Sequence, residues 1–360
     1  MTVAQTAPRR FRALHVLLLG IVLVALLGAA HAVLWNAMAN RLGAGFAIWA
    51  DARRAAGWRV EHAPPVRGGW PLAATLRLPE FRLSGGGATI PGGAEWSAEA
   101  VTLRVALPRL DELEIRAGGA QRLRLGTLDL PFRADRLEGR VPLQAGVVPR
   151  GGAFEASRLR VGTPAGGVEV GALDLDLDTR ATAIEGEAAV TVRATLRDLL
   201  LPVATPLGRN VAEAGVDASV TGPIPGGRSP AARAATWRDS GGTLELRRLD
   251  LAWGAATARA AATLALDESL QPMGAGTLRL TGAEAVLDAL VAAGALPQRN
   301  AALARRVVGL LARPPEGGGP PAIEVPLTLE DRALAVARIP VARMPTLTWS
   351  AVREGAGPGP

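Results

Sequence analysis

The 360-residue sequence contains no cysteine, tyrosine or lysine, and only 3 histidines. The absence of cysteine excludes disulfide bonds, thiol nucleophiles and thiolate metal ligands. Alanine, glycine, arginine and proline abound, a profile that resembles GC-rich codon usage. The other missing residue types are therefore weak evidence about mechanism.

Sequence motifs of common enzymes are also absent. His15 and His31 fall in an apolar N-terminal run, so only His62 remains for a Ser-His-Asp arrangement. The sequence has no G-x-S-x-G, HExxH, Walker A or GxGxxG segment. We expect no enzymatic activity, no catalytic residue and no cofactor; a hydrolase remains a minor alternative.

The segment LDLDLD is the strongest candidate for a metal site, because it carries Asp174, Asp176 and Asp178, with Glu185 further on. Calcium loops use carboxylates at this spacing, but they need glycine at the sixth position, where this sequence has Thr179. The alternating leucines instead predict a strand whose aspartates share one solvated face. We therefore predict no metal site.

The formal net charge of +7 and the pI of about 11.2 come entirely from arginine. A basic balance permits an anionic partner, but the arginines are scattered singly or in pairs through leucine alternations. This pattern favours solvated arginines on outward strand faces, with their stems lying over apolar neighbours. We expect no nucleic-acid binding.

Residues 13–35 carry no charged side chain and are long enough to cross a bilayer. Three arginines precede this run, Arg9, Arg10 and Arg12. By the positive-inside rule, residues 1–12 should stay in the cytoplasm, and the bulk of the chain should lie in the periplasm. The expected location is therefore the inner membrane, with a single-pass signal anchor.

A helical pattern continues through residues 36–57 and ends at Gly57, a suitable C′ residue. Trp35 and Trp49 could mark the outer membrane boundary, where tryptophan rings settle. The alternative is a signal peptide cleaved after Ala32, because Ala30-His31-Ala32 fits the small-x-small rule. That alternative would leave a soluble periplasmic protein.

From residue 58 the hydrophobic period changes to two, which indicates antiparallel strands with one apolar and one polar face. The alternation slips at Gly126-Thr127 and at Arg247-Arg248, and each slip indicates a β-bulge or a short turn. Helical patterns cover the segment SPAARAATWRDS and two late segments. The first late helix should have Thr281 as its N-cap and end at Gly294; the second should begin at Pro297.

The predicted fold class is α+β, mainly antiparallel β. A transmembrane helix would precede a large, twisted β-sheet over residues 58–349 that folds on itself and carries two or three helices. A sub-boundary is expected near 223–230, and residues 350–360 should be a disordered tail.

Several segments resemble the bacterial family described as domain of unknown function 2125, over about residues 14–349. These segments are the anchor, the Gly-aromatic-Pro turn, the W-x3-GG-x-L-x-L core with the Trp-Gly pair after it, and the final hairpin. The residues that carry the resemblance are Gly69, Trp70, Pro71, Trp237, Gly241, Gly242, Trp253 and Gly254. The family often has glycine in the last hairpin turn, where this chain has Glu330-Asp331-Arg332.

The resemblance implies an uncharacterised envelope protein and transfers no catalytic residue. In layout the family is similar to other single-anchor envelope proteins, including the AsmA-like group implicated in lipid handling, an analogy that rests on architecture alone. A leucine-lined sheet must cover its apolar face with helices, another sheet or a ligand. We therefore expect partners that are the membrane and lipid-like molecules; the alternative is an assembly module that binds another envelope protein.

Overall fold

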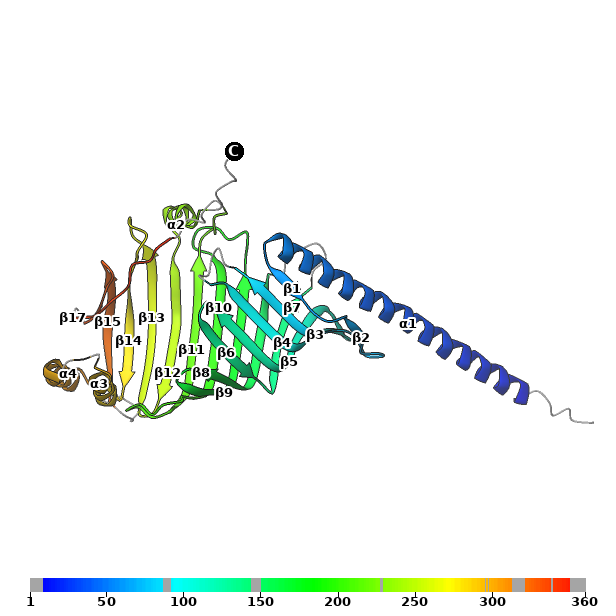
Figure 1. Cartoon of the computed structure of the whole chain (residues 1–360), viewed down its shortest axis with the longest axis horizontal. Coiled ribbons are helices and arrows are strands. Elements are labelled where there is room, and N and C mark those ends of the chain that lie inside the picture. Colours follow the sequence, from blue (N-terminus) through cyan, green and yellow to red (C-terminus); the bar gives the residue numbers. More distant parts are fainter. Residues whose placement is uncertain are drawn as a thin grey trace, which may run out of the picture.

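The computed structural model describes residues 9–86, 92–143, 150–226, 229–294, 296, 298–312, 321–337 and 339–349 (Figure 1). The helices are α1 (Arg9–Ala55), α2 (Pro230–Asp239), α3 (Ala283–Ala292) and α4 (Gln298–Leu311). The strands are β1 (Arg59–Glu61), β2 (Val66–Gly68), β3 (Ala73–Gly85), β4 (Ala94–Ala106), β5 (Arg109–Leu125), β6 (Leu128–Arg133), β7 (Arg136–Pro142), β8 (Gly151–Thr163), β9 (Gly166–Thr179), β10 (Ala188–Leu200), β11 (Asn210–Thr221), β12 (Leu244–Trp253), β13 (Ala256–Leu266), β14 (Pro272–Thr281), β15 (Ala322–Glu330), β16 (Ala333–Val336) and β17 (Ile339–Arg343).

Helix α1 joins the predicted membrane segment and its helical extension into one continuous element (Figure 1). Its apolar part is long and hydrophobic enough to cross a membrane, and no part of that stretch is buried in the structure. The helix ends as predicted, because Gly57 adopts a positive φ of 82°. The Trp58 N–H then donates to the Arg53 carbonyl and the Gly57 N–H to the Arg54 carbonyl, the hydrogen bonds of a Schellman cap.

The strands form an antiparallel meander, in which each strand from β3 onward, apart from β6, pairs with the next along the chain. β6 and β7 both lie between β5 and β8, and they pair with different parts of those two strands. β1 and β2 pair with different parts of β3. The N-terminal apolar helix followed by a large antiparallel sheet confirms the predicted α+β class.

The two slips in the leucine alternation have different causes. Gly126-Thr127 is the turn of the β5–β6 hairpin, where Gly126 adopts a positive φ of 59°. At Arg247-Arg248 the pairing of β12 with β13 jumps from Leu246 to Leu249, which is a β-bulge. After each slip the leucines return to the same face of the sheet, so both events preserve one apolar face.

Helix α2 begins where predicted, with the Ser229 hydroxyl as its N-cap, accepting from the Ala232 N–H. It connects β11 to β12, which pair with each other on either side of the sub-boundary expected near 223–230. The predicted turn of the last hairpin is also present, since β15 ends at Glu330 and β16 begins at Ala333. The chain then adds β17, which the sequence pattern did not predict as a separate strand.

The predicted N-cap of α3 is wrong. Thr281 is the last residue of β14, and its hydroxyl hydrogen-bonds to the Thr257 hydroxyl at 2.6 Å across the strands. The N-cap is Gly282, with a positive φ of 65°; a Cβ there would lie 2.3 Å from the Ala255 carbonyl oxygen. Thr281 therefore takes part in strand pairing and does not serve as the N-cap that the capping pattern suggested. Helix α3 ends near Gly294 as predicted, whereas Pro297 and the 350–360 tail lie outside the described residues.

Candidate functional surface: the leucine face of the sheet

Apolar residues that pair across neighbouring strands form a continuous row over the sheet. The row consists of Leu76, Leu103, Ile115, Gly139, Phe154, Leu175, Ala194, Val216, Leu249, Ala260, Leu278 and Val325. A second row on the same face consists of Leu137, Ala156, Leu173, Leu196, Ala214, Leu251, Ala258, Leu280 and Ile323. We call this surface the leucine face. It runs from β3, beside α1, to β15 at the other end.

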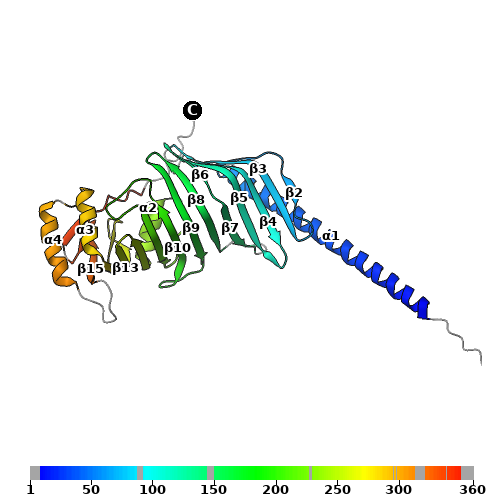
Figure 2. The same cartoon turned by 90° about the horizontal axis from the view of Figure 1, so that it is seen from below.

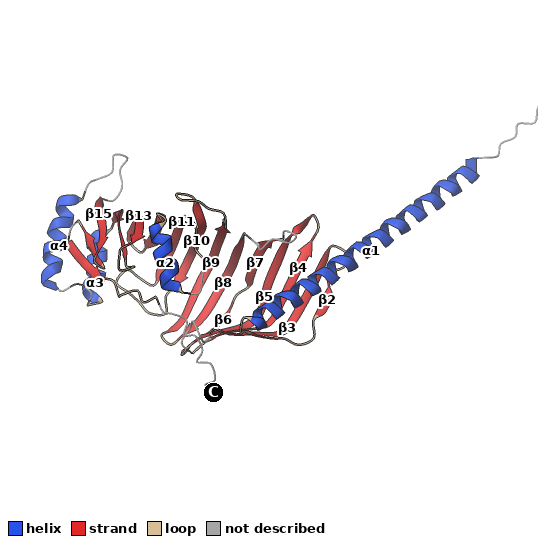
Figure 3. Ribbon diagram, turned by 90° about the horizontal axis from the view of Figure 1, so that it is seen from above, coloured by secondary structure: helices blue, strands red, loops and turns tan. Residues whose placement is uncertain are grey.

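The leucine face is densely packed at the end where α1 lies. There Leu42, Phe46 and Ala50 of α1 pack against a cluster on β1, β3 and β4. The buried strand residues of this cluster are Val60, Leu76, Leu78, Phe81, Ala98, Val101 and Leu103. The second half of α1 is therefore the cover of the first strands, and Figure 3 shows it passing over them.

Beyond α1 the leucines in the middle of the leucine face are only half-buried, whereas the row members Ala156, Ile323 and Val325 are buried. Leu173, Leu175 and Leu196 have intermediate exposure, and the side chain of Leu249 is 44% exposed. The short helices do not cover this middle region, because their main contacts with the sheet are at β13 and β15 (Figure 2). The middle of the leucine face thus leaves apolar area accessible.

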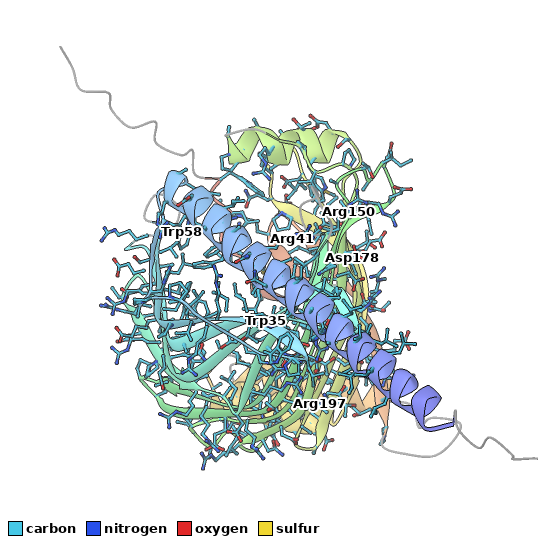
Figure 4. All side chains as sticks on the ribbon, turned by 90° about the vertical axis from the view of Figure 1, so that its right-hand side faces the viewer. Trp35, Arg41, Trp58, Arg150, Asp178 and Arg197 are labelled. Atoms are coloured by element: carbon cyan, nitrogen blue, oxygen red, sulfur yellow. The ribbon has the colours of Figure 1, made fainter. Side chains whose placement is uncertain are left out.

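The opposite face of the sheet carries alternating charges. One cross-strand row reads Arg104, Glu114, Arg140, Ala153, Asp176, Arg193, Asp217 and Arg248. Ion pairs link these residues to their neighbours, as in Arg104–Glu114 at 2.6 Å and Arg247–Asp217 at 2.7 Å. Figure 4, viewed from the α1 end, shows the strands curving in an arc with nitrogen- and oxygen-tipped side chains around its outer side. The arginines therefore lie on a solvated face of the sheet, as the sequence predicted.

Glu138 is the most enclosed charge on this face, with its side chain 2% exposed. Its carboxylate accepts hydrogen bonds from Arg116 at 2.9 Å and from Arg136 and Arg140 at 3.2 Å. Burial alone would raise the pKa of Glu138, but the neighbouring Arg116 and Arg136 guanidinium groups outweigh it and lower the pKa. Glu138 therefore stays ionised and acts as the hub of an ion-pair network over β5, β7 and β8.

The predicted strand character of LDLDLD is confirmed, because all three aspartates belong to β9. Asp174 pairs with Arg197 at 2.5 Å, and Asp176 lies opposite Arg193 of β10. Among the described residues, no three histidine, cysteine, aspartate or glutamate side chains lie together in a way that could hold a metal ion. The aspartates thus belong to the charged face.

Open pockets on the charged face and its rim have charged side chains in their linings. One, of about 600 Å³, is lined by Arg77, Arg116, Arg136 and Glu138 among others. A second of about 520 Å³ lies between Arg150, Asp178 and Arg193. Such linings do not suit an acyl chain. His62 takes no part in either lining; its ring lies 5.2 Å from that of Phe46 on α1.

The turn Gly69-Trp70-Pro71 docks directly on α1. The Trp35 indole N–H donates to the Ala73 carbonyl at 2.7 Å, and the His31 ring nitrogen Nε2 lies 2.7 Å from the Pro71 carbonyl oxygen. The Trp70 ring lies 4.9 Å from that of His31 and meets that of Trp35 edge-on at 5.8 Å. The sequence did not predict this contact, although a histidine inside an apolar helix was a signal for a partner.

The other predicted boundary residue, Trp49, lies elsewhere. Its ring stacks on that of Phe46 at 5.9 Å, with the Arg53 guanidinium 6.0 Å from its centre. Because Trp49 lies 14 positions beyond Trp35, the two rings are about 21 Å apart along the helix axis. At most one of them lies at a given membrane boundary. Arg9, Arg10 and Arg12 lie in the first turns of α1.

The other motif residues pack the ends of strands. Trp237 of α2 donates its indole N–H to the Thr221 carbonyl at 2.8 Å, and its ring lies against Gly242, where a Cβ would approach within 2.3 Å. Gly241 ends α2 with a positive φ of 73°. Trp253 donates to the Gly208 carbonyl at 3.1 Å, and Gly254 closes the β12–β13 turn with a positive φ of 57°. These residues are structural and do not converge on one site.

The family model described as "Uncharacterized protein conserved in bacteria (DUF2125)" matches residues 35–345. The chain therefore belongs to this family, as its motifs suggested. No curated protein and no solved structure matches the chain.

Proposed function

We propose that this protein is a single-pass inner-membrane protein with its bulk in the periplasm, which binds or shields lipid-like molecules on its leucine face and catalyses no reaction. One observation carries the proposal. The apolar rows continue from β3 to β15, whereas the packed cluster under α1 is built on β1, β3 and β4, and the leucines in the middle of the rows are only partly buried. Apolar area left half-buried is a binding surface for an apolar ligand, at about 25 cal/mol per Å² removed from water.

The chemistry of the two faces supports this choice of ligand. The leucine face presents leucine, valine and alanine side chains in regular rows, which can contact the methylene groups of an acyl chain but offer it no hydrogen bonds. The charged face keeps the other side of the sheet in water. This combination suits a molecule that must be kept from water without being recognised by polar groups.

Retention of α1 is part of the proposal. If the chain were cleaved after Ala32, the contact of His31 with the Pro71 carbonyl would be lost, together with the apolar run. The remaining helix would still cover β3 and β4. The docking of the Gly69-Trp70-Pro71 turn on both His31 and Trp35 favours a chain that keeps its anchor.

Site-specific photo-crosslinking tests the lipid proposal. A benzophenone amino acid replaces Leu175 on the leucine face, and in a matched variant it replaces Asp174, the adjacent residue on the charged face. Irradiation of intact cells followed by mass spectrometry of the purified chain should give adducts of acyl-lipid mass at position 175 and none at 174. Absence of lipid adducts at both positions, or equal yields, would reject the proposal.

A second candidate function, an assembly module that binds another envelope protein, has one observation in its favour. Helix α4 at the end opposite the anchor exposes Leu303 and Leu310, the latter 85% exposed (Figure 2). The same crosslinker placed at Leu310 should then yield a protein adduct of defined mass. A protein adduct at 310 without lipid adducts at 175 would favour this second function.

A further inference from the structure

An exposed apolar rim lies beside the anchor, at the ends of two hairpins. It consists of Val66 and the turn residues Trp70 and Leu72 before β3, together with Leu107 between β4 and β5. The two turns adjoin, because the Leu107 N–H donates to the Leu72 carbonyl at 3.3 Å. Leu72 is 71% exposed and Trp70 is 51% exposed. We call these four residues the anchor-side rim.

Contacts with α1 fix the height of this rim relative to the membrane. Trp70 touches His31 and Trp35, which lie at the end of the uncharged run 13–35. A crossing of about 30 Å takes roughly 20 helical residues, so a helix that enters the bilayer near residue 13 leaves it near His31 to Trp35. Trp70 is held at that same level, where tryptophan rings favour the membrane–water boundary.

The polar residues around the anchor-side rim also suit a position at the membrane–water boundary. Arg67 and Arg109 flank the two turns, and guanidinium groups at this height can reach lipid phosphates. Arg67 also donates to the Asn40 side chain at 2.7 Å, which ties the first turn to α1 just beyond the apolar run. Asp111 and Glu112 begin the next part of β5 and mark where the rim ends.

We propose that the anchor-side rim inserts into the outer surface of the membrane that α1 crosses, as a second membrane contact besides the anchor helix. With the rim in the membrane surface, the sheet would start at the lipid headgroups and extend away from them. Figure 1 shows α1 at one end of the sheet and α3 and α4 at the other. Leu76 and Leu103 are the first two members of the first leucine row. Leu76 follows Leu72 by four residues, and Leu103 precedes Leu107 by four residues. The inference rests on α1 crossing the membrane and does not require lipid on the leucine face.

Depth-dependent fluorescence quenching tests the rim directly, and the absence of native cysteine makes single-cysteine labelling clean. Leu72→Cys in the full chain is labelled with an NBD fluorophore and reconstituted into phosphatidylglycerol–phosphatidylethanolamine vesicles. Val203→Cys, an exposed apolar residue in the β10–β11 connection, is the matched control. Both side chains are exposed, so neither substitution removes core packing.

The rim label should show blue-shifted emission and a loss of intensity with lipids that carry a nitroxide near the headgroup. A nitroxide deep in the acyl chain should quench it less, because Leu72 lies at the boundary. The label at position 203 should show neither effect. A label at 72 that behaves like the one at 203 overturns the proposal; blue-shifted emission without nitroxide quenching also overturns it, in favour of a protein contact.

Discussion

At the scale of single residues, the stability of the sheet depends on a few close contacts at its ends and on one buried charge. Trp237 lies flat on Gly242, with no room for a side chain between the two. Glu138 is enclosed by three arginines on the charged face. Substitutions that disturb either contact should lower the free energy of unfolding by a predictable amount.

Gly242→Ala should destabilise the chain by about 1–3 kcal/mol, because the new Cβ would overlap the Trp237 ring and force the α2–β12 connection to move. Gly167→Ala in β9 is the control, since a Cβ there meets nothing within 4 Å. Urea unfolding in detergent, followed by circular dichroism, measures both. Equal unfolding midpoints for the two variants would contradict the packing of Trp237 described above.

Glu138→Gln should destabilise the chain by about 1.5–3 kcal/mol at neutral pH, the range for hydrogen bonds to charged groups. The lowered pKa of Glu138 means that its contribution is fully present above the ordinary carboxyl range of about 4.3 and is lost as pH falls through the lowered value. The difference between wild type and variant should therefore shrink in acid. Asp129→Asn, which breaks an exposed pair with Arg122, should change little at any pH. A pH-independent difference for Glu138→Gln would contradict the assignment.

At the scale of elements, the local alternation of the sequence predicted the strands and the faces they present. It could not distinguish a turn from a bulge, because both shift the alternation by one residue; cross-strand pairing decided between them at Gly126-Thr127 and Arg247-Arg248. The N-cap of α3 could not be predicted from the local sequence either. The capping pattern at Thr281 was sound as local chemistry, but pairing of β14 with β13 continues through that residue.

Gly282→Ala should therefore destabilise the chain more than Gly294→Ala at the other end of α3. Both glycines have positive φ, which costs a side chain about 1–2 kcal/mol. Only at Gly282 would the added Cβ also lie 2.3 Å from a backbone oxygen, that of Ala255; at Gly294 nothing lies within 4 Å. Thermal unfolding of the two variants compares them. A larger loss for Gly294→Ala would show that the β14–α3 junction is wrongly described.

At the scale of the whole molecule, the sequence predicted an anchor, a sheet and an apolar face, but not how much of that face is covered. Coverage depends on where α1, α2, α3 and α4 come to lie on the curved sheet, and local patterns carry no such information. The docking of Trp70 on His31 and Trp35 could not be predicted for the same reason, since about 40 residues separate the partners.

The proposed retention of α1 as a membrane anchor can be tested directly. The mature chain should have the intact mass of the full sequence, apart from removal of the initiator methionine, and should remain in membranes after alkaline extraction. Loss of the first 32 residues, or release of the chain by carbonate, would show that the apolar run is a cleaved signal peptide.

The central claim is that lipid-like molecules occupy the half-buried middle of the leucine face, and nitroxide accessibility tests it most directly. A spin label is attached at Leu249→Cys on the leucine face, and in a matched variant at Arg248→Cys, the next residue on the charged face. In native membranes the label at 249 should be accessible to molecular oxygen but not to a water-soluble nickel chelate, and the label at 248 should show the reverse. Access of the nickel chelate to position 249, or low access of both reagents there, would contradict lipid occupancy of the leucine face.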